Sequence, residues 1–288
     1  MHDPGVPTTP TVSIAIPTRR RSGYLDVALA SVVPQARRRG AEVLVVSDGP
    51  DPLAAAVADR REARFRSLPG ARGANAARNA AVDWASGETI VFVDDDVDAP
   101  AGWLDALLSG VEAAPDHDVF GGPIRPRLEG GGPRACGRES APITTLDHGS
   151  EDRDVALVWS ANMAVRRRAF DRVGRFDETI AGRGEEEEWE DRYLAAGGRI
   201  RYLGGAGLVH RRTQADATVR ALSRAAYGLG RTARRNDVRK RVAPSIALEL
   251  RTLLGCCWHI ARRRCAIGIV LVAQTGGRLR EALAERRA

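Results

Sequence analysis

Three short apolar runs, rich in β-branched residues, recur early in the chain. They are TVSIAIPT (11–18), EVLVVSDG (42–49) and TIVFVDDD (89–96). Apolar runs of this length without polar alternation are typical of strands that are buried on both faces of a parallel sheet. Helix-like stretches at 24–40 and 73–87 separate them. The order β-α-β-α-β predicts an α/β protein with an open, mostly parallel sheet flanked by helices.

The second half of the chain is less regular in its pattern. The expected elements are, in order, a strand leading into an irregular segment (118–128), a Gly/Pro-rich mobile loop (129–142), a strand followed by a helix from about Arg167 (154–176), a helix closed by glycine (184–198) and one or two strands (199–212). The remainder of the chain has a helical pattern to its end. We therefore predict a main domain at 1–213 and a mainly helical extension at 214–288.

Composition and charge narrow the class of protein. The chain has 288 residues, 43% of them apolar and 28% charged, as in an ordinary soluble globular protein with a sizeable core. The formal net charge is +7, and residues 214–288 alone hold 16 basic and 5 acidic residues. A basic segment favours an anionic membrane surface, nucleic acid or phosphate groups, although a solvated helical face explains it equally well.

The cysteine spacing and the first residues of the chain bear on the compartment of the protein. The four cysteines are Cys136, Cys256, Cys257 and Cys265. No two have CxxC spacing, so a metal cluster of the last three with His259 is disfavoured. The first ten residues lack the pattern of a signal peptide, and the late apolar run 266–273 is far shorter than the roughly 20 residues of a spanning helix. These features predict a cytoplasmic protein.

Polar residues follow each of the three early runs. Pro17 and Thr18 end the first, Asp48 follows the second, and three adjacent aspartates, residues 94–96, follow the third. In open α/β sheets, ligands bind outside the carboxyl ends of the strands. We therefore expect these residues to converge on one ligand site at that edge.

The three aspartates suit a divalent cation. Mg²⁺ is held by one or two carboxylates and completes its shell with water and substrate phosphates. Asp94 and Asp96, spaced one residue apart, fit such a metal–diphosphate site, and Asp95 remains available to a ribose or sugar hydroxyl. An Asp-rich turn is the plain alternative, but the position directly after a buried strand favours a functional site.

Two further residues are candidates near a nucleotide. Asp48 can accept hydrogen bonds from a nucleobase N–H, although Asp-Gly is also an ordinary turn sequence. Arg78, in a helix that opens with small residues, can approach a nucleotide or brace the acidic site. A solvated surface arginine is the alternative.

The acidic run GEEEEWEDR (184–192) is the second unusual feature. Glutamates at a helix start are favoured by the helix dipole, which by itself explains a solvated acidic face. A carboxylate near a bound sugar nucleotide can also take a proton from an attacking hydroxyl. His210 follows an apolar run and is a candidate metal ligand, or else a buried structural histidine.

Several of these segments, in this order, resemble the family 2 glycosyltransferases, inverting enzymes of the GT-A fold that use nucleotide sugars. The resemblance covers roughly residues 11–213. It rests on VSIAIPTRRRSGYLDVALASV, VLVVSDGPD, GANAARNAAVDWASGETIVFVDDD and WSANMAVRRRAFDRVGRFDE. It implies a GT-A (Rossmann-like) sheet, a nucleotide-diphosphate sugar donor, and a divalent cation, Mg²⁺ or Mn²⁺.

The resemblance also implies a general base. In the family, a Glu-Asp pair precedes a further acid, an arginine and a glycine that closes the helix. Counting back from Arg192 and Gly197 places the pair on Glu185 and Glu186, with Glu186 as the implied base. Glutamate stands where aspartate is usual, which leaves Glu185, Glu186 and Glu187 hard to separate.

The implied metal ligands are Asp94, Asp96 and His210, and the implied nucleotide-sugar contacts come from one short set of residues. That set is Pro17, Thr18, Asp48, Arg78, Asp94 and Asp95. The acceptor is a hydroxyl on a small molecule, a glycan or a lipid-linked sugar. By this count the second acidic pair, Glu190 and Asp191, takes no part in catalysis.

Two other function classes are weighed against this one. A nucleotidyltransferase acting on a sugar phosphate shares the sheet, nucleotide and metal, but it usually has a glycine-rich loop after the first strand, where this chain has PTRRRSGY. A non-catalytic nucleic-acid-binding protein would explain the basic tail, but few aromatics and a net-acidic main domain argue against it. No specific nucleic acid is expected.

The basic extension admits two structural interpretations. Val219, Leu222, Ala226 and Leu229 recur at nearly helical spacing, and this apolar stripe is predicted to pack on the main domain. Alternatively, the extension lies on the inner face of an anionic membrane as a peripheral contact, without spanning it.

Overall fold

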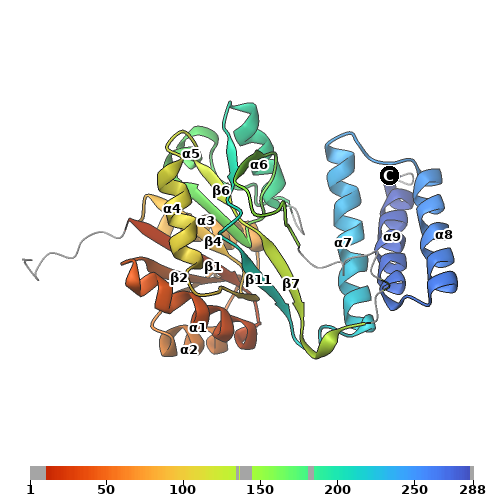
Figure 1. Ribbon diagram of the computed structural model, residues 1–288, viewed down its shortest axis with the longest axis horizontal. Helices are drawn as coiled ribbons and strands as arrows, with labels where there is room; N and C mark the ends of the chain where they lie inside the picture. The colour runs from red at the N-terminus through yellow and green to blue at the C-terminus, as the bar shows by residue number, and fades with distance from the viewer. Residues whose placement is uncertain (1–10, 134–135, 137–144, 181–184, 286–288) are drawn as a thin grey trace, which may run out of the picture. The chain divides into compact units, whose positions relative to one another are not determined.

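The computed structural model describes residues 11–133, 136, 145–180 and 185–285 (Figure 1). The chain divides into two compact units. The first contains residues 1–125, 146–180 and 185–209, and the second contains 126–145, 181–184 and 210–288.

The first unit is built on a mixed sheet of eight strands in the order β3-β2-β1-β4-β9-β6-β10-β8. The strands are β1 (Val12–Thr18), β2 (Glu42–Ser47), β3 (Arg64–Ser67), β4 (Thr89–Val93), β6 (Val119–Gly121), β8 (Arg153–Val155), β9 (Asn162–Arg166) and β10 (Ile200–Tyr202). Strands β3, β2, β1 and β4 run parallel. Strand β9 is antiparallel to β4 and β6, and β8 is antiparallel to β10. The predicted open, mostly parallel sheet is confirmed.

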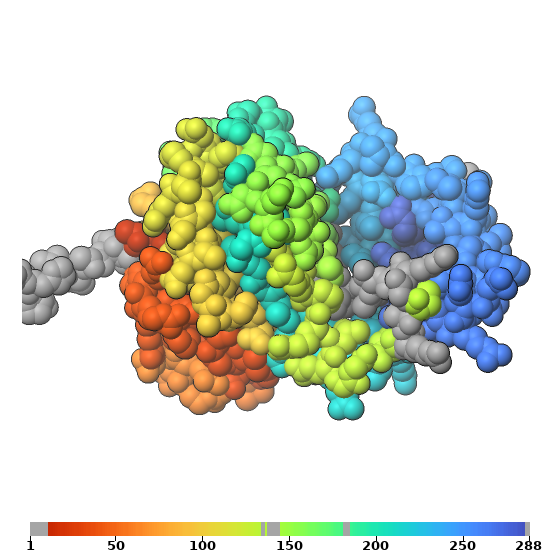
Figure 2. Space-filling view, viewed as in Figure 1, coloured from red at the N-terminus to blue at the C-terminus, as the bar shows by residue number. Residues whose placement is uncertain are grey.

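Helices cover both faces of this sheet. They are α1 (Ser22–Arg38), α2 (Pro52–Arg60), α3 (Ala74–Trp84), α4 (Trp103–Ala113), α5 (Arg167–Val173) and α6 (Glu185–Ala195). Ile14 and Ile16 of β1 belong to the core shared with α1, α2 and α4, whereas Ala15 belongs to the core shared with α3, α5 and α6. Because successive side chains alternate between faces, this two-sided burial explains the unbroken apolar runs. In Figure 2 the red to orange side chains of α1 and α2 and the yellow ones of α4 cover one face.

Two early sequence assignments were incomplete. Helix α2 and strand β3 stand between the second and third apolar runs, so the first half contains four parallel strands rather than three. Strand β3 is a sheet edge with the sequence RFRS and is mostly exposed, so it lacks the apolar pattern of a buried strand. The segment 118–128, predicted as one strand and an irregular stretch, forms β6 and β7 (Ile124–Leu128).

A second, three-stranded sheet has the order β5-β11-β7, with β5 at Val97–Asp98 and β11 at Leu208–Arg212. A 3₁₀ turn, Glu129–Gly131, follows β7. Most of the remaining segment predicted as a mobile loop lies outside the described residues. The predicted helix after Arg167, the helix closed by Gly197 and the two strands at 199–212 are all present.

The second unit contains three long helices, α7 (Val219–Arg239), α8 (Ile246–Arg263) and α9 (Ala266–Glu285). Leu222 and Ala226 of α7 pack with Val270 of α9. Leu128 of β7 also packs against this cluster, so α9 and β7 both supply partner surface for the stripe. Packing of the stripe on the rest of the main domain stays a prediction. No helix among the described residues is both long enough and apolar enough to cross a bilayer.

Helices α7 and α9 approach each other closely at positions where one of them has a glycine. A Cβ added at Gly277 would lie 2.1 Å from the carbonyl oxygen of Tyr227, and one at Gly230 would lie 1.9 Å from the carbonyl oxygen of Gln274. Real Cβ atoms cannot come this close to a backbone oxygen. The absence of side chains at both positions is therefore a requirement of the packing.

Substitution of the two neighbouring glycines of α9 tests this contact. Gly277→Ala is expected to destabilise the protein by about 1–3 kcal/mol, the usual cost of overpacking. Gly276→Ala is the matched control, because a Cβ there meets nothing within 4 Å, and it should stabilise the helix by about 0.5–1 kcal/mol. Urea unfolding measures both; equal effects of the two variants would refute the close approach.

Candidate active site

One arginine joins the acidic residues that follow β4. Asp95 and Asp96 are almost fully buried. Arg21, the residue before α1, contacts both: its Nη1 lies 2.8 Å from Oδ1 of Asp95, and its Nη2 donates to Oδ2 of Asp96 at 2.5 Å. Thr18, at the end of β1, donates its hydroxyl to Asp95 at 2.7 Å. The ends of β1 and β4 are thereby tied together at the edge where a ligand is expected.

Crowding makes Asp95 hard to ionise. Its pKa is raised to about 7: burial is the largest cause, the charge of Arg21 lowers the pKa, and the neighbouring charges of Asp96 and Asp94 raise it. A positive charge brought to this edge would favour the ionised form of all three carboxylates. Their oxygen ligands are those that Mg²⁺ and Mn²⁺ prefer, so the residues present fit a divalent cation.

Asp48 anchors the loop that leads into α3. Its Oδ1 accepts hydrogen bonds from the backbone N–H groups of Arg72 at 2.6 Å and Gly73 at 3.0 Å. Arg19 lies 3.5 Å from its Oδ2. This arrangement positions the loop, and binding of a nucleobase by Asp48 stays a prediction.

Arg78 is buried and faces the start of α6. Its Nη1 donates to Oε2 of Glu185 and to Oδ1 of Asn75, both at 3.0 Å. Burial lowers the pKa of Arg78, but the charges of Glu186, Asp94 and Glu185 outweigh it and raise the pKa. Arg78 thus links the acidic start of α6 electrostatically to the acids after β4, which is the bracing arrangement weighed for it from the sequence.

The glutamates of α6 differ in their partners. Glu185 pairs with Arg78, and Glu188 pairs with Arg192 one turn later at 2.6 Å. Glu186 is buried, and its Oε1 accepts from both the backbone N–H and the hydroxyl of Ser160, each at 3.3 Å. Among the residues that the structure describes, Glu186 makes no ion pair with an arginine, although its charge acts on Arg78. Its second oxygen takes no part in the Ser160 bonds.

Glu190 has a structural environment. It is 1% exposed, and its Oε1 accepts a hydrogen bond from the N–H of Val158 at 3.0 Å. Its Oε2 has no hydrogen-bond partner within the described part of the chain. Burial raises the pKa of Glu190 well above its usual value, and the nearby charges of Glu186, Glu187 and Asp191 act in the same direction. No arginine pairs with it in the described contacts.

Pro17 and His210 are the other two residues predicted for the site. Pro17, next to Thr18 in β1, is half-buried. His210 is buried in β11 and belongs to the second unit. Its role as a metal ligand stays a prediction. Arg21 and Ser160 were not singled out from the sequence; the one available signal for Arg21 was its place three residues after a strand that ends at the site.

Residues 13–174 match the family described as Glycosyl transferase family 2. The chain belongs to this family. It is 31% identical over 221 residues to the pre-mycofactocin glycosyltransferase of Mycobacterium tuberculosis, covering 73% of this chain and 45% of that protein. It is 26% identical to glycosyltransferase AglE of Haloferax volcanii, covering 66% of this chain and 63% of the relative. The chain thus spans about half to two thirds of the length of these relatives.

Solved structures with the GT-A fold are similar to this family 2 chain. Mannosyltransferase PcManGT from Pyrobaculum calidifontis, in complex with GDP-Man and Mn²⁺, has a TM-score of 0.58 at 16% identity, covering 96% of this chain and 74% of that one. TarS 1–349 of S. aureus has a TM-score of 0.54 at 18% identity, covering 94% and 91%. GalNAc-T7 with UDP, GalNAc and Mn²⁺ has a TM-score of 0.56 at 14% identity, covering 78% and 48%. The likeness shows the GT-A fold.

The raised pKa of Glu190 predicts how the stability of the protein depends on pH. Because its folded pKa is raised, the folded protein binds this proton more tightly than the unfolded chain does, and the contribution of Glu190 to stability is lost as pH rises above the usual value of 4.5. Glu190→Gln keeps the group neutral and should remove this loss, so the variant gains on wild type as pH increases.

Urea unfolding between pH about 4.5 and 8 measures the difference. Asp191→Asn, on the exposed side of the same helix, is the control for loss of a carboxylate. A constant difference between Glu190→Gln and wild type across this range would contradict a raised pKa of Glu190.

Proposed function

We propose that this chain is an inverting, metal-dependent glycosyltransferase that moves a sugar from a nucleoside-diphosphate sugar to an acceptor hydroxyl. The observation that carries the proposal is the pair of buried acidic groups in the first unit: the carboxylates after β4, gathered by Arg21, and the start of α6, linked to them through Arg78. Family membership favours this reaction over nucleotidyl transfer, which the sequence left open.

In this proposal Asp94 and Asp96 hold the cation, with His210 as a further candidate ligand. The cation supplies positive charge that neutralises the diphosphate leaving group. PcManGT and GalNAc-T7, which share the fold, are described with Mn²⁺ and with GDP-Man or UDP. The nucleotides and the cation described with these two proteins support a nucleotide donor and a divalent cation, Mn²⁺ or Mg²⁺, for this chain. Pro17, Thr18, Asp48 and Asp95 lie on the donor side.

Glu186 is the proposed general base. Ser160 holds one of its oxygens from a neighbouring loop and so orients the carboxylate. Glu185 is engaged by Arg78 and Glu188 by Arg192, so the buried carboxylate best suited to take a proton from an acceptor hydroxyl is Glu186. Attack from the face opposite the leaving group would convert an α-linked donor into a β-linked product.

A panel of UDP- and GDP-sugars tests the function and the metal together. In the presence of Mn²⁺ or Mg²⁺, wild type should hydrolyse one of these nucleotide sugars or be thermally stabilised by it. Chelator should remove this effect. Asp96→Ala should abolish turnover and remain folded, because Arg21 keeps Asp95 as a partner. Asp105→Ala, which removes a surface carboxylate paired with Arg39, is the control. Full activity in excess chelator would refute the metal assignment.

Substitution of the acids of α6 tests the base. Glu186→Gln should lower turnover at least about a hundredfold, the low end for general-base catalysis, while donor binding is nearly retained. Glu187→Gln and Asp191→Asn are the controls on the same helix and should remain active. Loss of turnover in either control with full activity of Glu186→Gln would assign the base elsewhere.

We also propose that the second unit rests on an anionic membrane through α8. Leu250, Leu254 and Trp258 are spaced by four residues and form one exposed stripe, with Leu254 and Trp258 each 69% exposed. Arg251 and the three arginines at 262–264 are exposed on the same helix and its end. An apolar stripe flanked by arginines suits the boundary between headgroups and acyl chains, where a lipid-linked acceptor would also be found.

Flotation with anionic liposomes measures this contact. Wild type is expected to bind at low salt, and Leu254→Ser with Trp258→Ser should lose most of the binding. Leu53→Ser is the matched control, since Leu53 has the same 69% exposure but lies on α2 of the first unit. Equal binding by the double variant and this control, or binding that only detergent reverses, would contradict a shallow contact through α8.

A further inference from the structure

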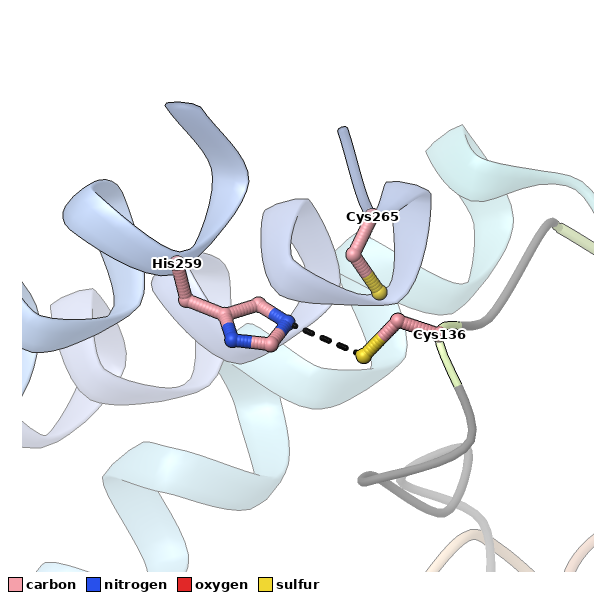
Figure 3. A group of neighbouring side chains, drawn as sticks. All are labelled: Cys136, His259 and Cys265. Atoms are coloured by element: carbon pink, nitrogen blue, oxygen red, sulfur yellow. Dashed lines mark hydrogen bonds between the residues drawn. The ribbon is translucent and has the colours of Figure 1, made fainter. Parts of the chain in front are cut away.

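A cysteine from the segment after β7 meets a histidine and a second cysteine in the second unit. Sγ of Cys136 lies 3.4 Å from Nε2 of His259. The ligand atoms of Cys136, His259 and Cys265 all lie within 4.8 Å of one another (Figure 3). Cys136 is 123 residues away from His259 in the chain, so no local sequence motif brings these groups together.

We propose that Cys136, His259 and Cys265 form a zinc site, separate in its chemistry from the site for Mg²⁺ or Mn²⁺. Two thiolates and an imidazole are ligands that select Zn²⁺, whereas carboxylates and water select Mg²⁺ and Mn²⁺. Three protein ligands leave the fourth tetrahedral position to water or to an exogenous group.

The spacing of the three groups fits this metal. With Zn–S of about 2.3 Å and Zn–N of about 2.0 Å, a tetrahedral centre places sulfur and nitrogen about 3.5 Å apart and two sulfurs about 3.8 Å apart. The 3.4 Å between Sγ of Cys136 and Nε2 of His259 matches the first value. All three ligand atoms lie within 4.8 Å of one another, so the other two distances need only small changes to reach the values of a tetrahedral centre.

The backbone at the α8–α9 junction brings two of the ligands together. Arg264 has φ 50° and ψ 38° and ends α8 in a left-handed turn, so the chain reverses between His259 and Cys265. Cys265 directly precedes α9, and its carbonyl accepts a hydrogen bond from the N–H of Gly268 at 3.1 Å. A helix N-terminus favours a negative group such as a thiolate.

Gly268 lies directly against Ile260 and beside His259 at this junction. A Cβ there would lie 2.6 Å from Cγ1 of Ile260 and 3.5 Å from Cδ2 of His259. The first turn of α9 therefore packs directly against the end of α8, beside the ring of His259. Two of the three ligands are held by a helical junction, and Cys136 is the group that a bound metal would fix to it.

The sequence disfavoured a metal cluster of Cys256, Cys257 and Cys265 with His259 and gave no reason to consider Cys136. Cys256 and Cys257 are absent from the three-residue group found among the described residues. Cys257 is exposed on α8. It therefore serves as a matched control, being a cysteine on the same helix as His259 but outside the proposed site.

Metal content and a cobalt titration on the reduced full-length chain test the proposal. Wild type purified without chelator should carry about one zinc per chain, and Co²⁺ should replace it with the thiolate-to-cobalt absorption of a tetrahedral site. Cys136→Ser removes an exposed ligand, so the variant should fold while its metal affinity falls at least about tenfold, the low end of the loss on removing even an outer-shell partner.

Two controls separate this site from others. Cys257→Ser should show the same thiolate-to-cobalt absorption as wild type, and so should Asp96→Ala, whose defect would lie in the proposed catalytic metal site alone. The proposal is overturned if reduced wild type takes up no Co²⁺, if Cys136→Ser binds it as tightly as wild type, or if alkylation and mass spectrometry show a Cys136–Cys265 disulfide in place of bound metal.

Discussion

Adjacent carboxylates at the end of a buried strand are the constraint on which the rest of the first unit depends. Ionised groups removed from water are costly unless cations and hydrogen bonds compensate for the lost hydration. Arg21 meets Asp95 and Asp96 from the start of α1, and Thr18 adds a hydroxyl from β1. The compensation is incomplete, as the raised pKa of Asp95 shows. A site left short of positive charge is suited to receive a cation together with its substrate.

The same principle distinguishes the acids of α6. A run of glutamates at a helix start is electrostatically favourable as a whole, but each carboxylate meets a different neighbour. Glu185 pairs with Arg78, Glu188 pairs with Arg192, and burial raises the pKa of Glu190. Glu186 accepts hydrogen bonds from the hydroxyl and backbone N–H of Ser160, and its charge also acts on Arg78. The hydrogen bonds from Ser160 orient its carboxylate, as the proposed role of general base requires.

The second unit uses much of its positive charge internally. Arg231 pairs with Glu281, Arg234 with Glu285, and Arg278 with both Glu249 and Asp237. These pairs connect α7 and α8 to α9, where the glycines permit close packing. A net charge counted along the sequence therefore overstates what a membrane would meet. The exposed arginines of α8 and its end, Arg251 and residues 262–264, are among the charges that remain available to an anionic surface.

The sequence by itself determined the α/β class, the open sheet, the family and the edge at which polar residues gather, because apolar periodicity and strand-end chemistry are local properties. It missed β3, whose RFRS sequence carries no apolar signal at an exposed edge, and it did not predict that α9 packs against the α7 stripe. Only the tertiary structure gave Arg21, Ser160 and Arg78 their partners, and only it brought Cys136 to His259 across 123 residues. Contacts between distant segments depend on how whole elements pack, and no spacing within one segment encodes them.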